Sequence, residues 1–208
     1  MATPANLRIA EAYLIRHDPV LAAVIDREGA CTLAPHREYY RALVDSIIGQ
    51  QLSVKAAARI KQRFRELFGG KFPAPEEILQ KSPEALRAVG LSLAKAKYVR
   101  DLAQHIIDGK IRFDKLETQT NQQIIAKLTD VKGIGEWTAD MFLILCVGRL
   151  DVLPTGDLGI KNGVKKLYNL KSASTLTQIT QIAEQNNWHP YESVASYYVW
   201  RSLNNSPS

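Results

Sequence analysis

Apolar residues recur three and four positions apart along nearly the whole chain, and this spacing predicts an all-α protein. Strand-like alternation of useful length does not occur in the sequence. We expect one compact domain over residues 1–208, without repeats or linkers. The predicted helices cover residues 7–15, 19–28, 37–48, 53–68, 75–80, 82–88, 92–108, 124–147 (interrupted by a turn), 158–168, 175–186 and 190–203.

The same spacing indicates which side chains face the core. In the first helix we expect Leu7, Leu14 and Ile15 to point inward, and in the helix over 92–108 we expect the same of Leu102 and Ile107. The tail over 204–208 is expected to be disordered, as chain ends without apolar residues usually are.

A two-glycine turn interrupts the apolar run between about residues 120 and 147. Gly133 and Gly135 stand where one helix must end and the next begin. Glycine allows positive φ and leaves no side chain between the backbone and a ligand. The helix that follows presents unpaired N–H groups and the positive end of its dipole. The turn therefore predicts a phosphate site, assisted by Lys132 or Thr138.

The turn has a simpler interpretation as well. Two antiparallel helices are often joined by a tight turn with glycine at the C-cap, and such a turn need bind nothing. The formal net charge of +6 and the pI near 9.3 favour a polyanionic partner, although the charge alone is weak evidence.

A second feature lies about twenty residues further on. Asp157 follows a loop rich in proline and glycine, over about 148–157, and directly precedes a helical pattern. The simplest interpretation is a helix N-cap. The same position suits chemistry, because N–H donors at a positive helix end keep the pKa of a carboxyl low. An ionised, fixed carboxylate stabilises a developing cation or orients a water molecule.

Several classes of protein are excluded by what the sequence lacks. Its two cysteines, Cys31 and Cys146, form no Cys-x-x-Cys pair, and its four histidines have no ligand-like spacing, so we expect no metal held by side chains. No run of residues is long and apolar enough for a membrane span, and the first residues lack the apolar core of a signal peptide. We expect a soluble, intracellular protein that does not contact a membrane.

The hairpin, the Gly/Pro-rich loop and the aspartate, in this order, resemble the HhH-GPD superfamily of DNA base-excision glycosylases. Within the superfamily the chain most resembles the 3-methyladenine DNA glycosylase II group, in a compact form without the N-terminal β domain. The resemblance covers about residues 37–203 and implies two helical lobes with a cleft between them. Its supporting segments are 47–53, 89–92, 95–97, 135–139, 157–161 and 188–191, with Trp200 near the end.

The resemblance implies a role for each matching residue. Asp157 matches the catalytic aspartate, and Gly133 and Gly135 match the phosphate-gripping hairpin. Trp137 stands where bifunctional members carry a lysine nucleophile. Because tryptophan cannot form a Schiff base, we expect a monofunctional glycosylase without lyase chemistry. Lys161, one turn beyond Asp157, is expected to meet a phosphate or simply to be solvated.

The base pocket and the intercalating side chain are expected from the same resemblance. Trp200, Met141 and Trp137 match positions of the pocket, although each could instead belong to the core. Gln51 matches the side chain that fills the gap left by the base, with Ser53 as a second candidate. Gln51 could also cap the preceding helix.

The expected partner is double-stranded DNA that contains a damaged base, bound by a monomer. No cofactor is expected, apart from a structural Na⁺ or K⁺ held by hairpin carbonyls near Val131 and Gly133, as in members of the family. The expected reaction is hydrolysis of the N-glycosidic bond of alkylated purines. The alternatives are a non-catalytic helix-hairpin-helix DNA-binding module and a glycosylase for deaminated or oxidised bases.

Overall fold

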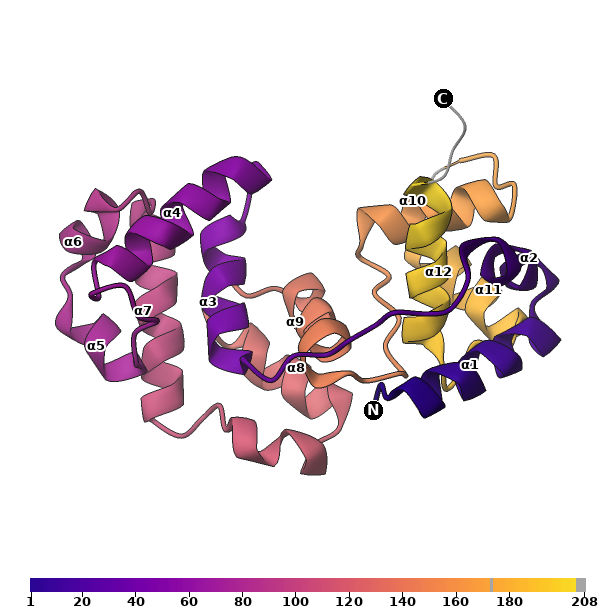
Figure 1. Cartoon of the computed structure of the whole chain (residues 1–208), viewed down its shortest axis with the longest axis horizontal. Coiled ribbons are helices and arrows are strands. Elements are labelled where there is room, and N and C mark those ends of the chain that lie inside the picture. Colours follow the sequence, from indigo (N-terminus) through magenta and orange to yellow (C-terminus); the bar gives the residue numbers. More distant parts are fainter. Residues whose placement is uncertain (173, 205–208) are drawn as a thin grey trace. The chain divides into compact units, whose positions relative to one another are not determined.

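The computed structural model describes residues 1–172 and 174–204, and these residues form helices, turns and loops without a strand (Figure 1). The α-helices are α1 (Pro4–His17), α2 (Pro19–Glu28), α3 (Tyr39–Gly49), α4 (Val54–Glu66), α5 (Pro75–Gln80), α6 (Pro83–Ala88), α7 (Leu93–Ile107), α8 (Asn121–Thr129), α9 (Glu136–Phe142), α10 (Leu158–Leu167), α11 (Leu176–Gln185) and α12 (Glu192–Asn204). A 3₁₀-helix spans Phe113–Thr118, and α9 continues directly into a π-helical segment, Leu143–Val147. The all-α fold class is confirmed.

The chain divides into two compact units. One consists of Glu38–Phe142, and we call it the hairpin unit because it contains α8 and α9. The other combines Met1–Arg37 with the chain from Leu143 onward, and we call it the aspartate unit because it contains Asp157. In the part of the chain that the structure describes, no helix is both long and apolar enough to cross a membrane.

In the aspartate unit, α12 packs against α1, α2 and α10 (Figure 1). The largest side chains of its core are those of Trp188 and Tyr198, and both are fully buried. Asp18 is buried beside Trp188: its carboxylate caps α2 by accepting from the N–H of Val20 and also accepts from Trp188 Nε1, at 2.8 Å. This pairing explains how a carboxylate is accommodated in the core.

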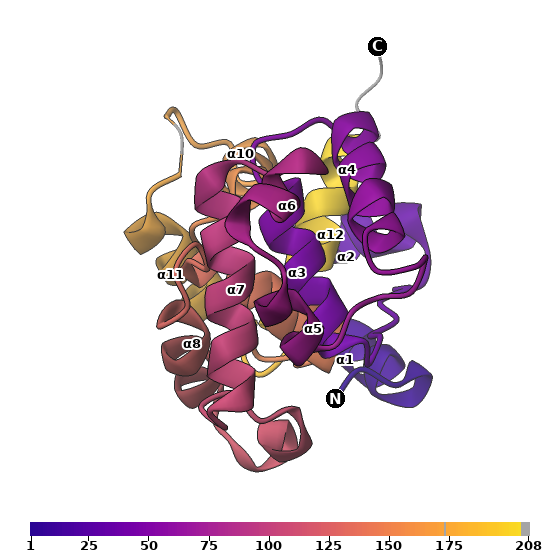
Figure 2. The same ribbon diagram turned by 90° about the vertical axis from the view of Figure 1, so that its left-hand side faces the viewer.

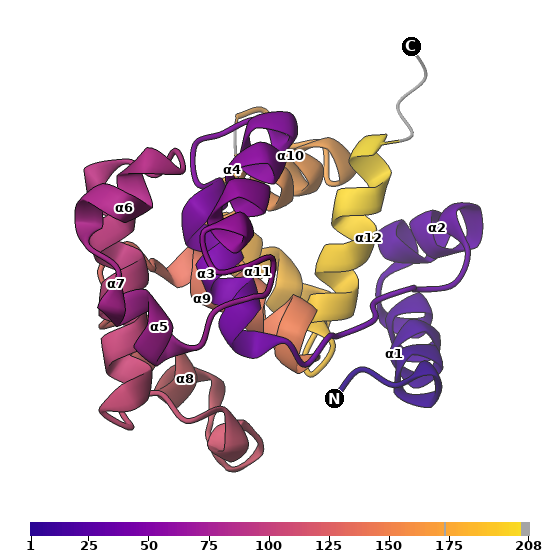
Figure 3. The ribbon, with the colours of Figure 1, turned by 60° about the vertical axis from the view of Figure 1, so that its left-hand side comes forward.

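In the hairpin unit, α7 packs against α3, α5 and α6 (Figure 2). Helix α3 also packs against α9, which pairs with α8 (Figure 3). The serines Ser53, Ser82 and Ser92 cap α4, α6 and α7, each through its hydroxyl oxygen. These caps satisfy N–H groups at the beginnings of the three helices.

The expected helices are all present, and their ends lie within a few residues of the predicted ones. Two expected core positions are wrong, because Ile15 is 46% exposed and Ile107 is 42% exposed. Ile15 directly follows Leu14, which is buried as predicted, and Ile107 is the last residue of α7. The expected disordered tail begins at Asn204, which ends α12, and residues 205–208 lie outside the described residues.

Candidate functional site

The turn between α8 and α9 requires glycine at its first glycine position. Gly133 has a φ of +85°, in the left-handed region that favours glycine. A Cβ atom built on Gly133 would lie 2.2 Å from a ring carbon of Tyr98 on α7. The ring therefore closes over the turn, and the predicted positive φ at Gly133 is confirmed.

Gly135 is different, because nothing in the protein requires glycine there. Its φ lies outside the left-handed region, and a Cβ atom would meet no heavy atom within 4 Å. The residue is exposed and directly precedes α9. A backbone that closely approaches an external ligand would need glycine at this position, although no contact within the protein does.

Side chains from α7 and from the end of α3 hold the turn in place. The N–H of Lys132 donates to Asp101 Oδ2, at 2.8 Å, and Gln50 Nε2 donates to the carbonyl oxygen of Gly133, at 2.7 Å. Lys95 Nζ donates in turn to the carbonyl of Gln50, at 2.6 Å. None of these contacts was expected from the sequence.

The two side chains that we expected to assist a phosphate differ in exposure. Lys132 is exposed, and this fits contact with an external anion. Thr138 is only 6% exposed, so little of its side chain is open to solvent. Assistance by the Thr138 side chain therefore stays a prediction, and its backbone N–H, in the first turn of α9, is suited to an anion as well.

The loop between α3 and α4 displays the two candidates for intercalation. The C-cap of α3 is Gln50, so Gln51 does not cap that helix. Gln51 is exposed and has a φ of +56°, which is unusual for a residue with a side chain. Ser53 accepts from the N–H of Ala56, so its hydroxyl already has a structural role.

Asp157 is the N-cap of α10, as predicted. Its Oδ1 accepts from the N–H of Ile160, at 2.9 Å, and from Nε1 of Trp200, at 2.8 Å. Two donors on one oxygen fix the direction of the carboxylate. Gly159 leaves room for the ring of Trp200. A Cβ atom on Gly159 would lie 2.8 Å from the ring, so a larger residue there would push the ring away.

The other tryptophan of the predicted pocket is exposed. Trp137 is 47% exposed on α9, so it is not a core residue. Met141, one turn further along α9, is half-buried. Lys161 is half-buried on α10, one turn beyond Asp157. In contrast, Trp188 and Cys146 are buried.

A carboxyl group of the hairpin itself is buried. Asp140 on α9 is 7% exposed, and burial, followed by the nearby charge of Glu136, raises the pKa of its carboxyl to about 7. This group is therefore largely protonated below neutral pH. Sequence analysis missed it because Asp140 looks like an ordinary polar position of a surface helix.

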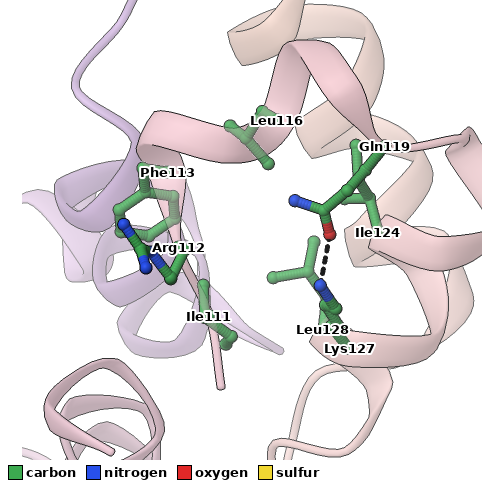
Figure 4. A pocket seen from close by; sticks show the side chains of 8 residues that line it. All are labelled: Ile111, Arg112, Phe113, Leu116, Gln119, Ile124, Lys127 and Leu128. Atoms are coloured by element: carbon green, nitrogen blue, oxygen red, sulfur yellow. Dashed lines mark hydrogen bonds between the residues drawn. The ribbon is translucent and has the colours of Figure 1, made fainter. Parts of the chain in front are cut away.

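Two pockets lie away from these residues. The pocket in Figure 4 has a volume of about 10 Å³, room for about one water molecule, and is lined by side chains that include Phe113, Leu116 and Leu128. Lys127 donates to Gln119 across it, at 2.5 Å. A concavity of about 450 Å³ in the aspartate unit is lined partly by Glu11 and Asp26. The acidic lining of the concavity does not suit DNA.

The predicted site residues thus form two groups. The aspartate unit holds Asp157, Lys161 and Trp200, and the bond between Asp157 and Trp200 joins two of them directly. The hairpin unit holds the other candidates, which are Gln51, Ser53, Val131, Lys132, Gly133, Gly135, Trp137, Thr138 and Met141.

Known proteins share this sequence pattern. Residues 44–188 match the family model described as HhH-GPD superfamily base excision DNA repair protein. DNA-3-methyladenine glycosylase 1 of Schizosaccharomyces pombe is 36% identical over 168 residues, which are 80% of this chain and 73% of the relative. The range matched by the family model includes both the hairpin and Asp157.

Solved structures share the fold. A DNA-3-methyladenine glycosidase from Bacillus halodurans superimposes with a TM-score of 0.85 and is 38% identical, covering 92% of this chain and 88% of that one. The 3-methyladenine DNA glycosylase Mag1 of S. pombe, in complex with abasic DNA, has a TM-score of 0.81 and 32% identity, covering 95% of this chain and 97% of that one.

Proposed function

The chain belongs to the HhH-GPD superfamily of base excision DNA repair proteins, and we propose that it is a monofunctional DNA glycosylase that releases alkylated purines from duplex DNA. The observation that carries the proposal is the fixed carboxylate of Asp157, held by the N–H of Ile160 and by Trp200. A helix-hairpin-helix module that only binds DNA would need Asp157 only as the N-cap of α10, not as a charged group that Trp200 also holds.

Hydrolysis of the glycosidic bond needs a charge close to the sugar. The C1′–N bond breaks with cationic character on the sugar, and the carboxylate of Asp157 would stabilise that cation or activate the attacking water. The bond is inaccessible inside a duplex, so the damaged nucleotide must first leave the stack. Binding energy from the rest of the protein must offset that cost, which is a few kcal/mol.

The hairpin would supply part of this binding energy. The backbone at Gly133 and Gly135 would hold a phosphate, with the exposed side chain of Lys132 beside it. Lys161 would meet a second phosphate near Asp157. Gln51, exposed on its loop, would fill the gap that the flipped base leaves.

The substrate class rests on the relatives and on the aromatic side chains. The S. pombe and B. halodurans proteins are named for 3-methyladenine. Alkylation makes a purine electron-poor and a good leaving group, so little acid catalysis on the base is needed. The ring of Trp200, which lies beside Asp157, would favour such a base by stacking and cation–π attraction. Trp137 also excludes a lyase step at its position, because it cannot form a Schiff base.

Replacement of Asp157 by asparagine tests the proposal. Asparagine keeps the N-cap and the size of the side chain but removes the charge. We expect single-turnover release of 7-methylguanine and 3-methyladenine to fall by about 100-fold or more, with unchanged binding to DNA that carries an abasic-site analogue. Asp26→Asn, which changes an exposed carboxyl on α2 that is not among the predicted site residues, is the matched control and should stay fully active.

The same assay separates the alternatives. Duplexes with hypoxanthine, uracil or 8-oxoguanine report on a glycosylase for deaminated or oxidised bases. Undiminished base release by Asp157→Asn would refute the catalytic role of Asp157. DNA binding without release of any of these bases by the unmodified protein would favour the pure binding module. Strand cleavage without added base or heat would contradict the monofunctional reaction.

Further parts of the proposal concern the cation, the assembly and the place of action. The carbonyl oxygen of Val131 accepts from the N–H of Ile134, and that of Gly133 accepts from Gln50. Each oxygen has a second lone pair, which suits Na⁺ or K⁺. Exchange of Na⁺ or K⁺ for a large organic cation at constant ionic strength should then weaken DNA binding. We propose that the protein acts as a monomer, inside the cell, where DNA lies in the nucleoid or nucleus.

A further inference from the structure

We propose that Gln50 is a positioning residue that couples the intercalating side chain of Gln51 to the phosphate-binding hairpin. The inference rests on the proposed function, because it assumes that both Gln51 and the hairpin contact DNA. Gln50 joins the two through its own atoms: its backbone precedes Gln51, and its side-chain amide donates to the carbonyl of Gly133, at 2.7 Å.

Gln51 needs such support because its backbone is in an unfavourable conformation. At a φ of +56°, its Cβ is crowded by the backbone, and glycine or asparagine would be the usual residue. Its side chain is exposed, so contacts with the protein do little to hold it. The conformation must therefore be held by its neighbours.

Lys95 holds the neighbouring backbone from the other side. Its ammonium group donates to the carbonyl oxygens of Ile48, at 2.9 Å, and of Gln50, at 2.6 Å. These carbonyls lie at the end of α3, where helical carbonyls have no partner within the helix and a positive charge is favourable. The half-buried lysine thus fixes the peptide that leads into Gln51.

The contacts form one chain from α7 through the loop to the hairpin. The ring of Tyr98, one turn beyond Lys95, also covers Gly133. A shift of Gln51 relative to the hairpin would break the bond between Gln50 and Gly133, which are 83 residues apart in sequence. The distance from the gripped phosphate to the intercalating side chain is then set before DNA binds, so little ordering is needed on binding.

A double-mutant cycle tests the coupling. Gln50→Met keeps the length of the side chain and removes the donor, and Gln51→Ala removes the intercalating side chain at the same φ. A duplex with 2-aminopurine next to an abasic-site analogue reports insertion by fluorescence, and a 7-methylguanine duplex reports single-turnover base release. Gln62→Met is the matched control, because Gln62 is exposed and donates to Glu66 on its own helix.

We expect Gln50→Met to weaken insertion and slow base release by about tenfold, the effect of one lost hydrogen bond. In a protein that already carries Gln51→Ala, Gln50→Met should slow base release by less than about twofold. Fully multiplicative effects would overturn the proposal, because Gln50 would then act independently of Gln51. A Gln50→Met protein that behaves like the unmodified protein would overturn it as well.

Lys95 provides a second route if Gln50→Met destabilises the fold. Lys95→Met should show the same non-additivity with Gln51→Ala. Lys95→Arg, which keeps a charged donor, should keep most of the insertion and base release of the unmodified protein. A general loss of stability would instead lower the melting temperature and slow base release equally with and without Gln51→Ala. If the unmodified protein releases no base, the proposed function fails. The 2-aminopurine signal of Gln50→Met, compared with that of the unmodified protein, still decides the coupling in that case.

Discussion

The two glycines of the hairpin allow a prediction that separates folding from binding. Gly133→Ala and Gly135→Ala add the same methyl group two residues apart in the same turn. The first methyl group would meet the ring of Tyr98 at 2.2 Å and sit at a φ of +85°, whereas the second would enter open space. We expect the first variant to lose stability and the second to lose DNA binding.

The magnitudes follow from these surroundings. At Gly133, the left-handed conformation costs about 1–2 kcal/mol for alanine, and displacement of a packed ring costs about 1–3 kcal/mol. For a chain of this size, the resulting loss should lower the melting temperature by roughly 5–15 °C. At Gly135, alanine precedes a helix less favourably than glycine, which destabilises the protein, but it also reduces the flexibility of the unfolded chain, which stabilises it. The net change in the free energy of unfolding should therefore stay within about 1 kcal/mol.

Binding should change in the opposite order. A methyl group at Gly135 would separate the backbone N–H from a phosphate, and the loss of a hydrogen bond to a charged group costs about 1.5–3 kcal/mol. Affinity for a duplex with an abasic-site analogue should therefore fall about 10–100-fold. Gly109→Ala is the matched control: it has a φ of +69° without any atom near its Cβ, so it isolates the cost of the backbone conformation alone.

Thermal unfolding and fluorescence anisotropy with labelled duplex measure the two effects separately. Undiminished affinity of Gly135→Ala would refute the backbone contact at this residue. A Gly133→Ala protein no less stable than Gly109→Ala would show that Tyr98 does not pack over the turn as described.

Two further predictions concern the buried polar groups. Trp200→Phe keeps an aromatic ring but removes the N–H that donates to Asp157. Single-turnover base release should therefore fall about tenfold or more, with little change in DNA affinity. Weaker DNA binding at an unchanged rate of base release would show that the ring only stacks on the base. The pKa of Asp140 is raised to about 7, so the folded state binds the proton more tightly than the unfolded state, and stability should fall as pH rises from about 4 to 7. Asp140→Asn should remove this dependence and stabilise the protein at pH 8 by up to a few kcal/mol. Denaturant unfolding at several pH values gives the free energy of unfolding of both proteins. Parallel plots of this free energy against pH for the variant and the unmodified protein would contradict the prediction.

Local chemistry explains which parts of the fold could be predicted from the sequence. Asp157 caps α10 through an N–H only three residues away, and Ser53 and Ser92 cap their helices in the same way. Such bonds depend on neighbouring residues, so spacing alone reveals them. The positive φ at Gly133 was predictable for the same reason.

The contacts that sequence reasoning missed are distant in the chain. Trp200 reaches Asp157 over 43 residues, and its predicted role was to stack on a base. The sequence shows that Trp200 is aromatic, but the direction of its N–H depends on how closely α12 packs on α10. The burial of Thr138 could not be predicted for a related reason, because one helical position decides whether a side chain faces solvent or the core.

The contacts around Gly133 and those around Asp157 share one physical feature. In each case a polar group of the proposed site, a carbonyl or a carboxylate, is held by a donor from a different helix of the same unit. A flexible group must be ordered when DNA binds, and that ordering reduces the binding energy available for base flipping. Groups that are already held avoid this cost. Gln50 and Trp200 are therefore the residues at which a conservative change should separate positioning from folding most clearly.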